Sequence, residues 1–240
     1  MGFEANPIPE HRNERADISS WKNGDYYLFE VKTREDHPSL MKRVLRTPDF
    51  EITEYKKELR RSNAISAIMK KASSQLSKTP KENNAFSCVW FRAVDHLIPD
   101  VVEFVQTSLY GIRHLLLFDS ERKSFYAKCY YFDYNDFFVY RNINAVVIDD
   151  GNAMYICVND FAERIQEFRN SELYRYYDGV GALIDPEKFR NDGSVLVADV
   201  DCPRNQVDRI KRYILRKYGL KVSNVFEMKS LAGIMMIPKE

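Results

Sequence analysis

The chain has 240 residues, of which 45% are hydrophobic and 30% are charged, and its formal net charge is +1. This composition excludes wholesale disorder, and the length allows one large domain or two small ones. No apolar run approaches the roughly 18 residues of a membrane span, and the four cysteines form no CxxC pair, so we expect a cytoplasmic protein with no membrane partner and with unpaired thiols rather than a zinc site.

The first predicted elements are two strands joined by a tight turn. Residues 14–21 (ERADISSW) and 26–34 (YYLFEVKTR) are rich in strand-forming residues, and Asn23-Gly24 lies between them. This dipeptide favours a type I′ hairpin turn, because both central residues of such a turn need positive φ. The turn sets the register of the two strands and places Asp17 opposite Glu30.

Asp17 and Glu30 are therefore expected on one face of the hairpin, where two carboxylates repel each other. Lys32 follows Glu30 by two residues and points to the same face. A divalent cation such as Mg²⁺ would compensate the repulsion, because it binds one or two carboxylates together with water and phosphate oxygens. It would polarise a phosphate and lower the pKa of a bound water, which the lysine would orient or help to deprotonate. The alternative is a surface hairpin whose three charged groups face solvent.

A basic helical region is predicted next, over residues 38–77, and within it residues 62–78 (SNAISAIMKKASSQLSK) have one apolar face. Residues 41–81 contain 11 Lys and Arg against 4 acids. Such an excess indicates a face that binds nucleic-acid phosphates, whereas a solvated helix face is the alternative. The candidate nucleic-acid-binding residues are Lys56, Lys57, Arg60, Arg61, Lys70 and Lys71.

Strands and helices alternate through the rest of the chain. Up to residue 120 the pattern predicts a buried strand, a helix ended by Gly111 and another strand, at residues 85–94, 100–111 and 112–120. Later segments predict strands at residues 123–132, 137–143 and 145–158 and a helix at residues 160–177. The tail, residues 194–238, is predicted to form a strand, a helix and two further strands. We therefore expect an α/β unit over residues 1–120 and an α+β accessory region over residues 121–240.

The hairpin and the elements after it resemble the PD-(D/E)XK nuclease superfamily, which includes restriction endonucleases and Holliday junction resolvases. Asp17 matches the first acid of the motif, and Glu30-Val31-Lys32 matches the (D/E)XK tripeptide. The resemblance covers about residues 1–95 and implies an α/β fold with a restriction-endonuclease-like mixed sheet flanked by helices. Ala16 stands where the family name has proline, and only 16 residues precede Asp17, too few for the family's usual first helix.

The resemblance also implies a site and an activity. Asp17 and Glu30 would bind Mg²⁺ or Mn²⁺, and Lys32 would assist the attacking water. Gln75 is the candidate for the polar residue that many members place near the metal, with Lys71 one helical turn earlier on the same face. We expect a Mg²⁺-dependent endonuclease that hydrolyses phosphodiester bonds in DNA, and double-strand cutting would favour a homodimer. The alternatives are a catalytically inactive nuclease fold that binds nucleic acid or assembles with a partner, and an interaction protein with no nucleic-acid role.

Overall fold

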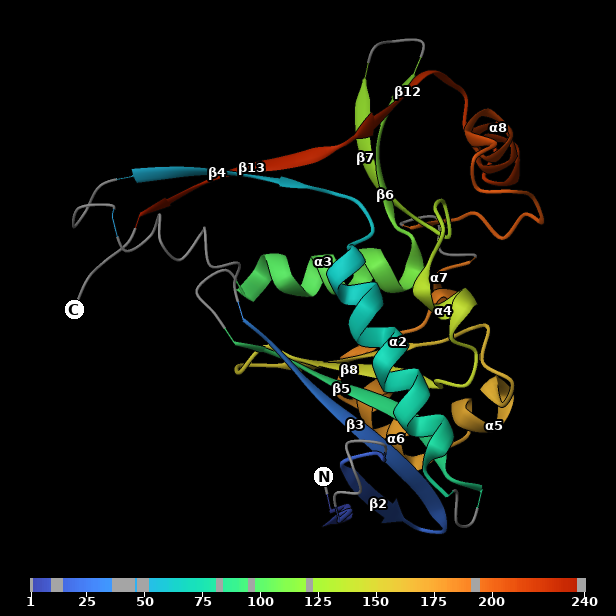
Figure 1. Ribbon diagram of the computed structural model, residues 1–240. Coiled ribbons are helices and arrows are strands. Elements are labelled where there is room, and N and C mark those ends of the chain that lie inside the picture. Colours follow the sequence, from blue (N-terminus) through green and yellow to red (C-terminus); the bar gives the residue numbers. More distant parts are fainter. Residues whose placement is uncertain are drawn as a thin grey trace.

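The computed structural model of the protein describes residues 2–9, 15–35, 46, 52–80, 84–94, 98–119, 123–190 and 195–236 (Figure 1). The large sheet of the described residues contains, in order, β1 (Glu4–Pro7), β2 (Ile18–Lys22), β3 (Asp25–Glu35), β5 (Phe86–Val94), β8 (Ala145–Asp149), β9 (Met154–Val158) and β10 (Leu183–Ile184). A second sheet contains β11 (Leu196–Val197), β7 (Ser124–Tyr130), β6 (Arg113–Asp119) and β12 (Val222–Met228), and β4 (Ile52–Glu58) pairs with β13 (Ser230–Met236). The helices are α2 (Asn63–Lys78), α3 (Ile98–Tyr110), α4 (Asp136–Val139), α5 (Ile165–Arg169), α6 (Glu172–Gly179), α7 (Pro186–Phe189) and α8 (Val207–Lys217).

The large sheet is mixed and has helices on both faces. β1, β2 and β3 form an antiparallel meander, β5 and β8 run parallel to β3, and β9 returns antiparallel to β8. Leu28 of β3 shares a core with residues of α2 and α3, whereas Tyr27 and Phe29 share a core with residues of α5 and α6. One strand supplies both cores because its successive side chains point to opposite faces. The expected mixed α/β sheet flanked by helices is confirmed at this level.

The β2–β3 hairpin has the register that the sequence predicts. Its Asn23-Gly24 turn has φ values of 48° and 90°, the positive values that a type I′ turn requires. The two strands stay paired up to Ile18 opposite Phe29. Asp17 precedes this last pair on one side and Glu30 follows it on the other. The ladder ends before them, because the Asp17 amide bonds to the Phe29 carbonyl, so the two acids are neighbours but are not the directly opposed pair that the sequence predicts.

The second sheet packs one face against α8. Leu115 and Leu117 of β6 share a core with Ile210 and Ile214 of the helix. β6 precedes residue 120 and pairs with β7, which follows it, while β8, β9 and β10 extend the large sheet. The division predicted near residue 120 therefore falls within a hairpin, and each sheet contains strands from both sides of it.

β4 and β13 form a two-stranded ribbon, here called the arm, that projects from the rest of the protein (Figure 1). The sequence predicts a helix over residues 38–77, and this is wrong for residues 52–58, which pair along their whole length with residues 230–236. A partner at the far end of the chain overrides local helical periodicity. Of the remaining predicted region, α2 is confirmed, and residues 38–45 and 47–51 lie outside the described residues.

Two later predictions also need correction. Residues 137–143, predicted as a strand, include most of α4, because the side chain of Asn135 caps this helix and accepts a hydrogen bond from the Phe138 amide at 2.8 Å. The predicted helix over residues 160–177 is two helices, α5 and α6, and the Ser171 side chain caps the second. The other predicted segments have the expected type where they are described. None of the helices in the described part of the chain is long and apolar enough to cross a membrane.

Candidate active site

Glu30 occupies the centre of β3 on the face that α2 covers. Its side chain has no exposed surface, because Leu28 beside it belongs to the core that β3 shares with α2. A strand position between two helical layers would ordinarily hold an apolar residue, so an acid here is costly unless it is paired. The position therefore calls for a compensating charge.

Asp17 approaches Glu30 from the end of the neighbouring strand. Its amide donates a hydrogen bond to the Phe29 carbonyl at 3.0 Å, and its Oδ2 accepts one from the Val31 amide at 2.7 Å. Asp17 is thus tied to the backbone on both sides of Glu30, by its amide to Phe29 and by its carboxylate to Val31. The hairpin brings the two acids together as the sequence predicts.

Lys32 supplies the positive charge of the site. Its Nζ forms an ion pair with Oε1 of Glu30 and donates a hydrogen bond to Oε1 of Gln75 at 3.1 Å. The lysine side chain is 17% exposed and Gln75 is 7% exposed, so both polar ends lie mostly out of bulk water. Asp17, Glu30, Lys32 and Gln75, the four predicted catalytic residues, therefore meet at one place.

The last turn of α2 fixes the segment that carries Asp17. Gln75 donates from Nε2 to the Arg15 carbonyl at 3.5 Å, and Oγ1 of Thr79 accepts a hydrogen bond from the Ala16 amide at 2.7 Å. Thr79 in turn donates its hydroxyl hydrogen to the Gln75 carbonyl at 2.9 Å. Sequence reasoning missed Thr79: its position just after an amphipathic helix indicates a helix end, but its partner lies 63 residues earlier.

Burial raises the pKa of Glu30 above its ordinary value, and the ion pair with Lys32 opposes this shift. The nearby charge of Asp17 raises the pKa further, and that of Lys71 on α2 lowers it. Among the described residues, Oε2 of Glu30 is buried and has no hydrogen-bond partner. A carboxylate that is buried, close to a second carboxylate and half unpaired has the properties of a cation ligand.

These residues fit a divalent cation of the Mg²⁺ type. The part of the chain that the structure describes contains no group of three or more His, Cys, Asp or Glu side chains that could hold a metal ion. Mg²⁺ does not require such a group, because it commonly takes one or two carboxylates and completes its shell with water and substrate phosphate oxygens. Asp17 and Glu30 would be the protein ligands.

The predicted nucleic-acid-binding residues do not form one face. Lys70 and Lys71 are exposed on α2, whereas Arg60 is exposed and pairs with Glu58 at 2.5 Å. Arg61 has a structural partner, because its Nε donates at 2.9 Å to the fully buried carboxylate of Asp136.

The remaining two predicted residues, Lys56 and Lys57, lie on β4 and not on a helix, and their side chains are outside the described part of the protein. Asn63, where α2 begins, is twelve residues from Gln75, which corresponds to roughly 18 Å along the helix. The arm and the candidate site therefore lie toward opposite ends of α2 (Figure 1).

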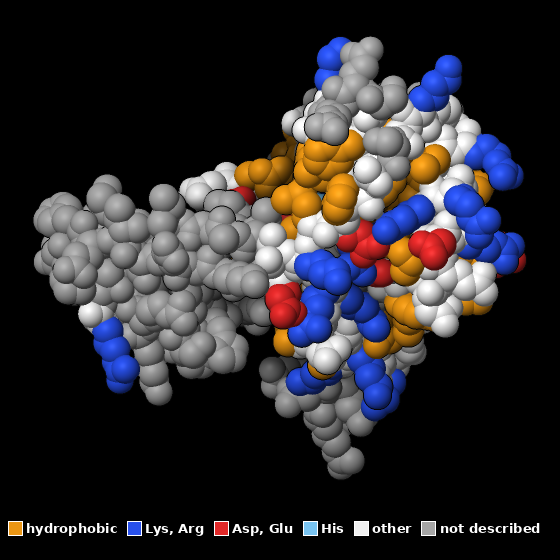
Figure 2. Space-filling model, turned by 90° about the horizontal axis from the view of Figure 1, so that it is seen from above, with side chains coloured by type: hydrophobic (Ala, Val, Ile, Leu, Met, Phe, Trp, Pro, Cys, Tyr) orange, Lys and Arg blue, Asp and Glu red, His pale blue; other side chains and the backbone are white. Residues whose placement is uncertain are grey.

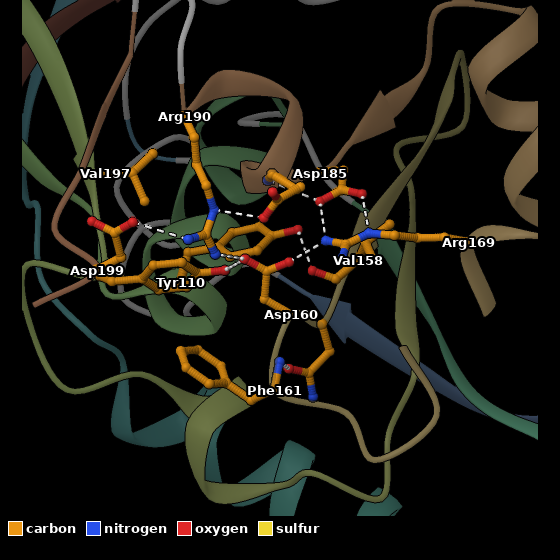
Figure 3. Close-up of polar contacts among 12 residues, drawn as sticks. Tyr110, Val158, Asp160, Phe161, Arg169, Asp185, Arg190, Val197 and Asp199 are labelled. Carbon is orange, nitrogen blue, oxygen red and sulfur yellow. Dashed lines mark hydrogen bonds and ion pairs between the residues drawn. The ribbon is translucent and has the colours of Figure 1, made fainter. Parts of the chain in front are cut away.

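A second group of charged side chains joins the two sheets (Figure 3). Arg169 pairs with Asp160 and with Asp185, the latter at 2.8 Å, and Arg190 lies 3.1 Å from Asp160 and 2.9 Å from Asp199. Each of these charges has an opposite partner, and the residues come from α5 and from the ends of β9, β10, α7 and β11. This network ties the second sheet to the first.

No family model matches the chain, and no curated protein or solved structure matches it. The candidate site is therefore defined by the contacts among Asp17, Glu30, Lys32 and Gln75.

Proposed function

We propose that the protein is a divalent-metal-dependent nuclease with a restriction-endonuclease-like fold, which hydrolyses phosphodiester bonds in DNA. The observation that carries the proposal is the buried carboxylate of Glu30, whose Oε2 has no partner among the described residues while Lys32 and Asp17 lie beside it. The element order supports the proposal. The meander β1–β3 is followed in the chain by β4 of the arm, then by α2, and then by β5 parallel to β3. Apart from β4, this matches the three strands, helix and strand that follow the first helix in the core of the family that the sequence resembles.

Asp17 and Glu30 would hold the cation, which when bound polarises a phosphate and lowers the pKa of a water molecule. Asp17 already has one carboxylate oxygen fixed by the Val31 amide, so this side chain loses little freedom on binding. Glu30 must be ionised to serve as a ligand. Burial disfavours its ionised form, and the ion pair with Lys32 favours it.

Lys32 is the residue that acts on the substrate. Two acceptors on different elements, Glu30 on β3 and Gln75 on α2, hold its Nζ in place. A positive charge fixed there would stabilise the negative charge that develops on the phosphoryl oxygens, and would orient the attacking water. Preorganisation of this kind costs no rearrangement when the reaction occurs.

A cleavage assay tests the proposal. Plasmid, linear and single-stranded DNA are incubated with Mg²⁺, Mn²⁺ or EDTA, and the natural protein is compared with Lys32→Ala and Asp17→Asn. We expect metal-dependent cutting that both substitutions reduce by about 10²–10⁴-fold, the range for loss of a positioned catalytic group. Lys128→Ala is the matched control, because Lys128 is also a partly buried lysine in an ion pair, with Glu103, but lies on β7.

The outcomes separate the nuclease from its alternative. If both variants keep their fold and lose cutting while the control retains it, the proposal stands. If the natural protein cuts none of these substrates with either metal but still shifts DNA in a salt-sensitive way, the proposal fails and a non-catalytic nucleic-acid-binding module replaces it.

A further inference from the structure

Helix α8 carries a stripe of outward-facing arginines. Arg209, Arg212 and Arg216 lie at spacings of three and four residues, which places them on one side of the helix, and all three are exposed. The opposite side carries Ile210 and Ile214, which are buried in the core shared with the second sheet. The stripe is therefore held on a rigid element.

The lysines of α8 differ from these arginines in having acidic partners. Lys211 pairs with Glu227 at 2.8 Å, and Lys217 pairs with Asp199 at 2.7 Å. The three arginines form no ion pair with any acid in the described residues. Arg209 instead donates to the Gln206 side chain at 3.2 Å, and Arg212 donates to a backbone carbonyl of its own helix. On α8, therefore, the two lysines have acidic partners, whereas the three exposed arginines have none among the described residues.

The stripe does not serve the stability of the helix. Arg209 lies in the first turn, where a cation opposes the helix dipole. Arg212 and Arg216 are four residues apart, a spacing at which like charges are destabilising. The single acid of the helix, Asp208, offsets only part of this charge. Arg216 in the last turn is favourable, and Asp208 and Arg212 are oppositely charged residues four positions apart, so the favourable and unfavourable contributions are of similar size and helix stability does not account for the stripe.

A nucleic-acid backbone matches this stripe. Guanidinium groups form paired hydrogen bonds with phosphate oxygens, and duplex DNA presents one charge per roughly 1.7 Å of its axis. The seven-residue step from Arg209 to Arg216 spans about 10 Å of helix, enough to face several phosphates. Figure 2 looks down on the side of the protein where α8 lies in Figure 1, and Lys and Arg side chains are spread over the coloured part of this view.

We propose that Arg209, Arg212 and Arg216 of α8 bind the phosphate backbone of DNA, so that α8 holds the substrate of the site on β3. The choice of DNA as the partner rests on the proposed function. The contact is independent of sequence and is made without metal. Binding of the DNA backbone would thus be made by α8, which lies outside the basic segment of residues 41–81.

The test is equilibrium binding of a labelled DNA duplex in EDTA at several salt concentrations, measured by fluorescence anisotropy. The variant carries Arg209→Gln, Arg212→Gln and Arg216→Gln together, and its unfolding midpoint is checked first. Each phosphate contact contributes about 0.9 to the slope of log affinity against log salt. We expect the slope to fall by about 2.7 and the affinity to fall by about a hundredfold at physiological salt.

The control removes three cations elsewhere. Lys22→Gln, Arg175→Gln and Lys188→Gln change residues that pair with acids on α6, namely Glu172 and Asp178. We expect this variant to keep the natural protein's slope of log affinity against log salt. It lowers the net charge by as much as the α8 variant does, but it removes no phosphate contact.

Three results would overturn the inference: unchanged DNA binding by the α8 variant, an equal loss in the control, or arginine-dependent binding of anionic lipid vesicles by a protein that does not bind DNA. Its failure is distinguishable from failure of the nuclease proposal. α8-dependent binding without cutting would leave the inference standing and refute the nuclease. If the α8 variant keeps both its affinity for DNA and metal-dependent cutting, the nuclease proposal stands and the inference about α8 is refuted.

Discussion

Replacing Thr79 by valine removes one hydroxyl group and leaves the shape of the side chain nearly unchanged. In the natural protein that hydroxyl is 2.7 Å from the Ala16 amide and 2.9 Å from the Gln75 carbonyl, at a residue that is 5% exposed. The substitution leaves the Ala16 amide buried without a partner, and an unsatisfied buried donor costs about 1–3 kcal/mol. We therefore expect Thr79→Val to lower the free energy of unfolding by about 1–3 kcal/mol.

The effect should reach the candidate site, because Asp17 follows Ala16 directly. A cation that binds the folded protein at 100 times its Kd adds about 2.7 kcal/mol to stability, and we expect Thr79→Val to reduce the stabilisation that a fixed Mn²⁺ concentration gives. Chemical denaturation with and without Mn²⁺ measures both quantities. Thr79→Ser is the control, because it keeps the hydroxyl and loses only a methyl group. If valine and serine behave alike, or if valine leaves the Mn²⁺ effect unchanged, Thr79 does not position Asp17.

Three further predictions follow from single contacts. The raised pKa of Glu30 predicts that the metal-free protein gains stability from this group as pH falls through the range above the ordinary 4.5, because the folded state binds this proton more tightly than the unfolded state does; chemical denaturation in EDTA at several pH values tests the sign, and an equal pH dependence in Glu30→Gln would contradict it. Gly111→Ala should lower the free energy of unfolding by well over the roughly 1–2 kcal/mol that a left-handed backbone costs a residue with a Cβ, because its φ is 60° and the added Cβ would overlap a backbone oxygen. Gly151→Ala, at φ 83° with open space around it, should cost only this backbone strain, and equal losses in thermal unfolding of the two variants would contradict the prediction. Arg61→Ala should destabilise the protein by about 3–5 kcal/mol, because it leaves the buried carboxylate of Asp136 without its guanidinium; a loss of DNA affinity with unchanged stability would show instead that Arg61 acts in binding.

The candidate site was predictable where its geometry is set locally. Asn23-Gly24 is a two-residue turn with one preferred conformation, and it determines which residues face each other over the next several positions. Glu30 and Lys32 then share a face because strand side chains alternate. The inferences from the turn and from strand alternation need nothing from distant parts of the chain. Gln75, which lies 43 positions from Lys32, is indicated only by the resemblance.

The remainder depends on partners that no local pattern reveals. Residues 52–58 (ITEYKKE) combine helix-favouring Glu and Lys with strand-favouring Ile, Thr and Tyr, and β13 at the other end of the chain supplies the hydrogen bonds of a strand. Its charge and its place in a basic segment make Arg61 a candidate for phosphate binding. In the structure, however, its guanidinium is bonded to Asp136, which lies 75 positions later in the chain. The sequence identifies Thr79 only as a residue at a helix end, because its hydrogen bond with the Ala16 amide depends on the tertiary fold. Charge and periodicity predict candidates, and tertiary pairing decides which of them are free.

The most direct test of the central claim is Mn²⁺ binding in the absence of nucleic acid, followed by the electron paramagnetic resonance signal of the free ion. We predict saturable binding by the natural protein, retained in Lys128→Ala and lost in Asp17→Asn and in Glu30→Gln, because each of these two variants removes one of the two carboxylate ligands. Equal Mn²⁺ binding by the natural protein and by both acid variants, or no binding by the natural protein, would contradict the claim that Asp17 and Glu30 form a metal site.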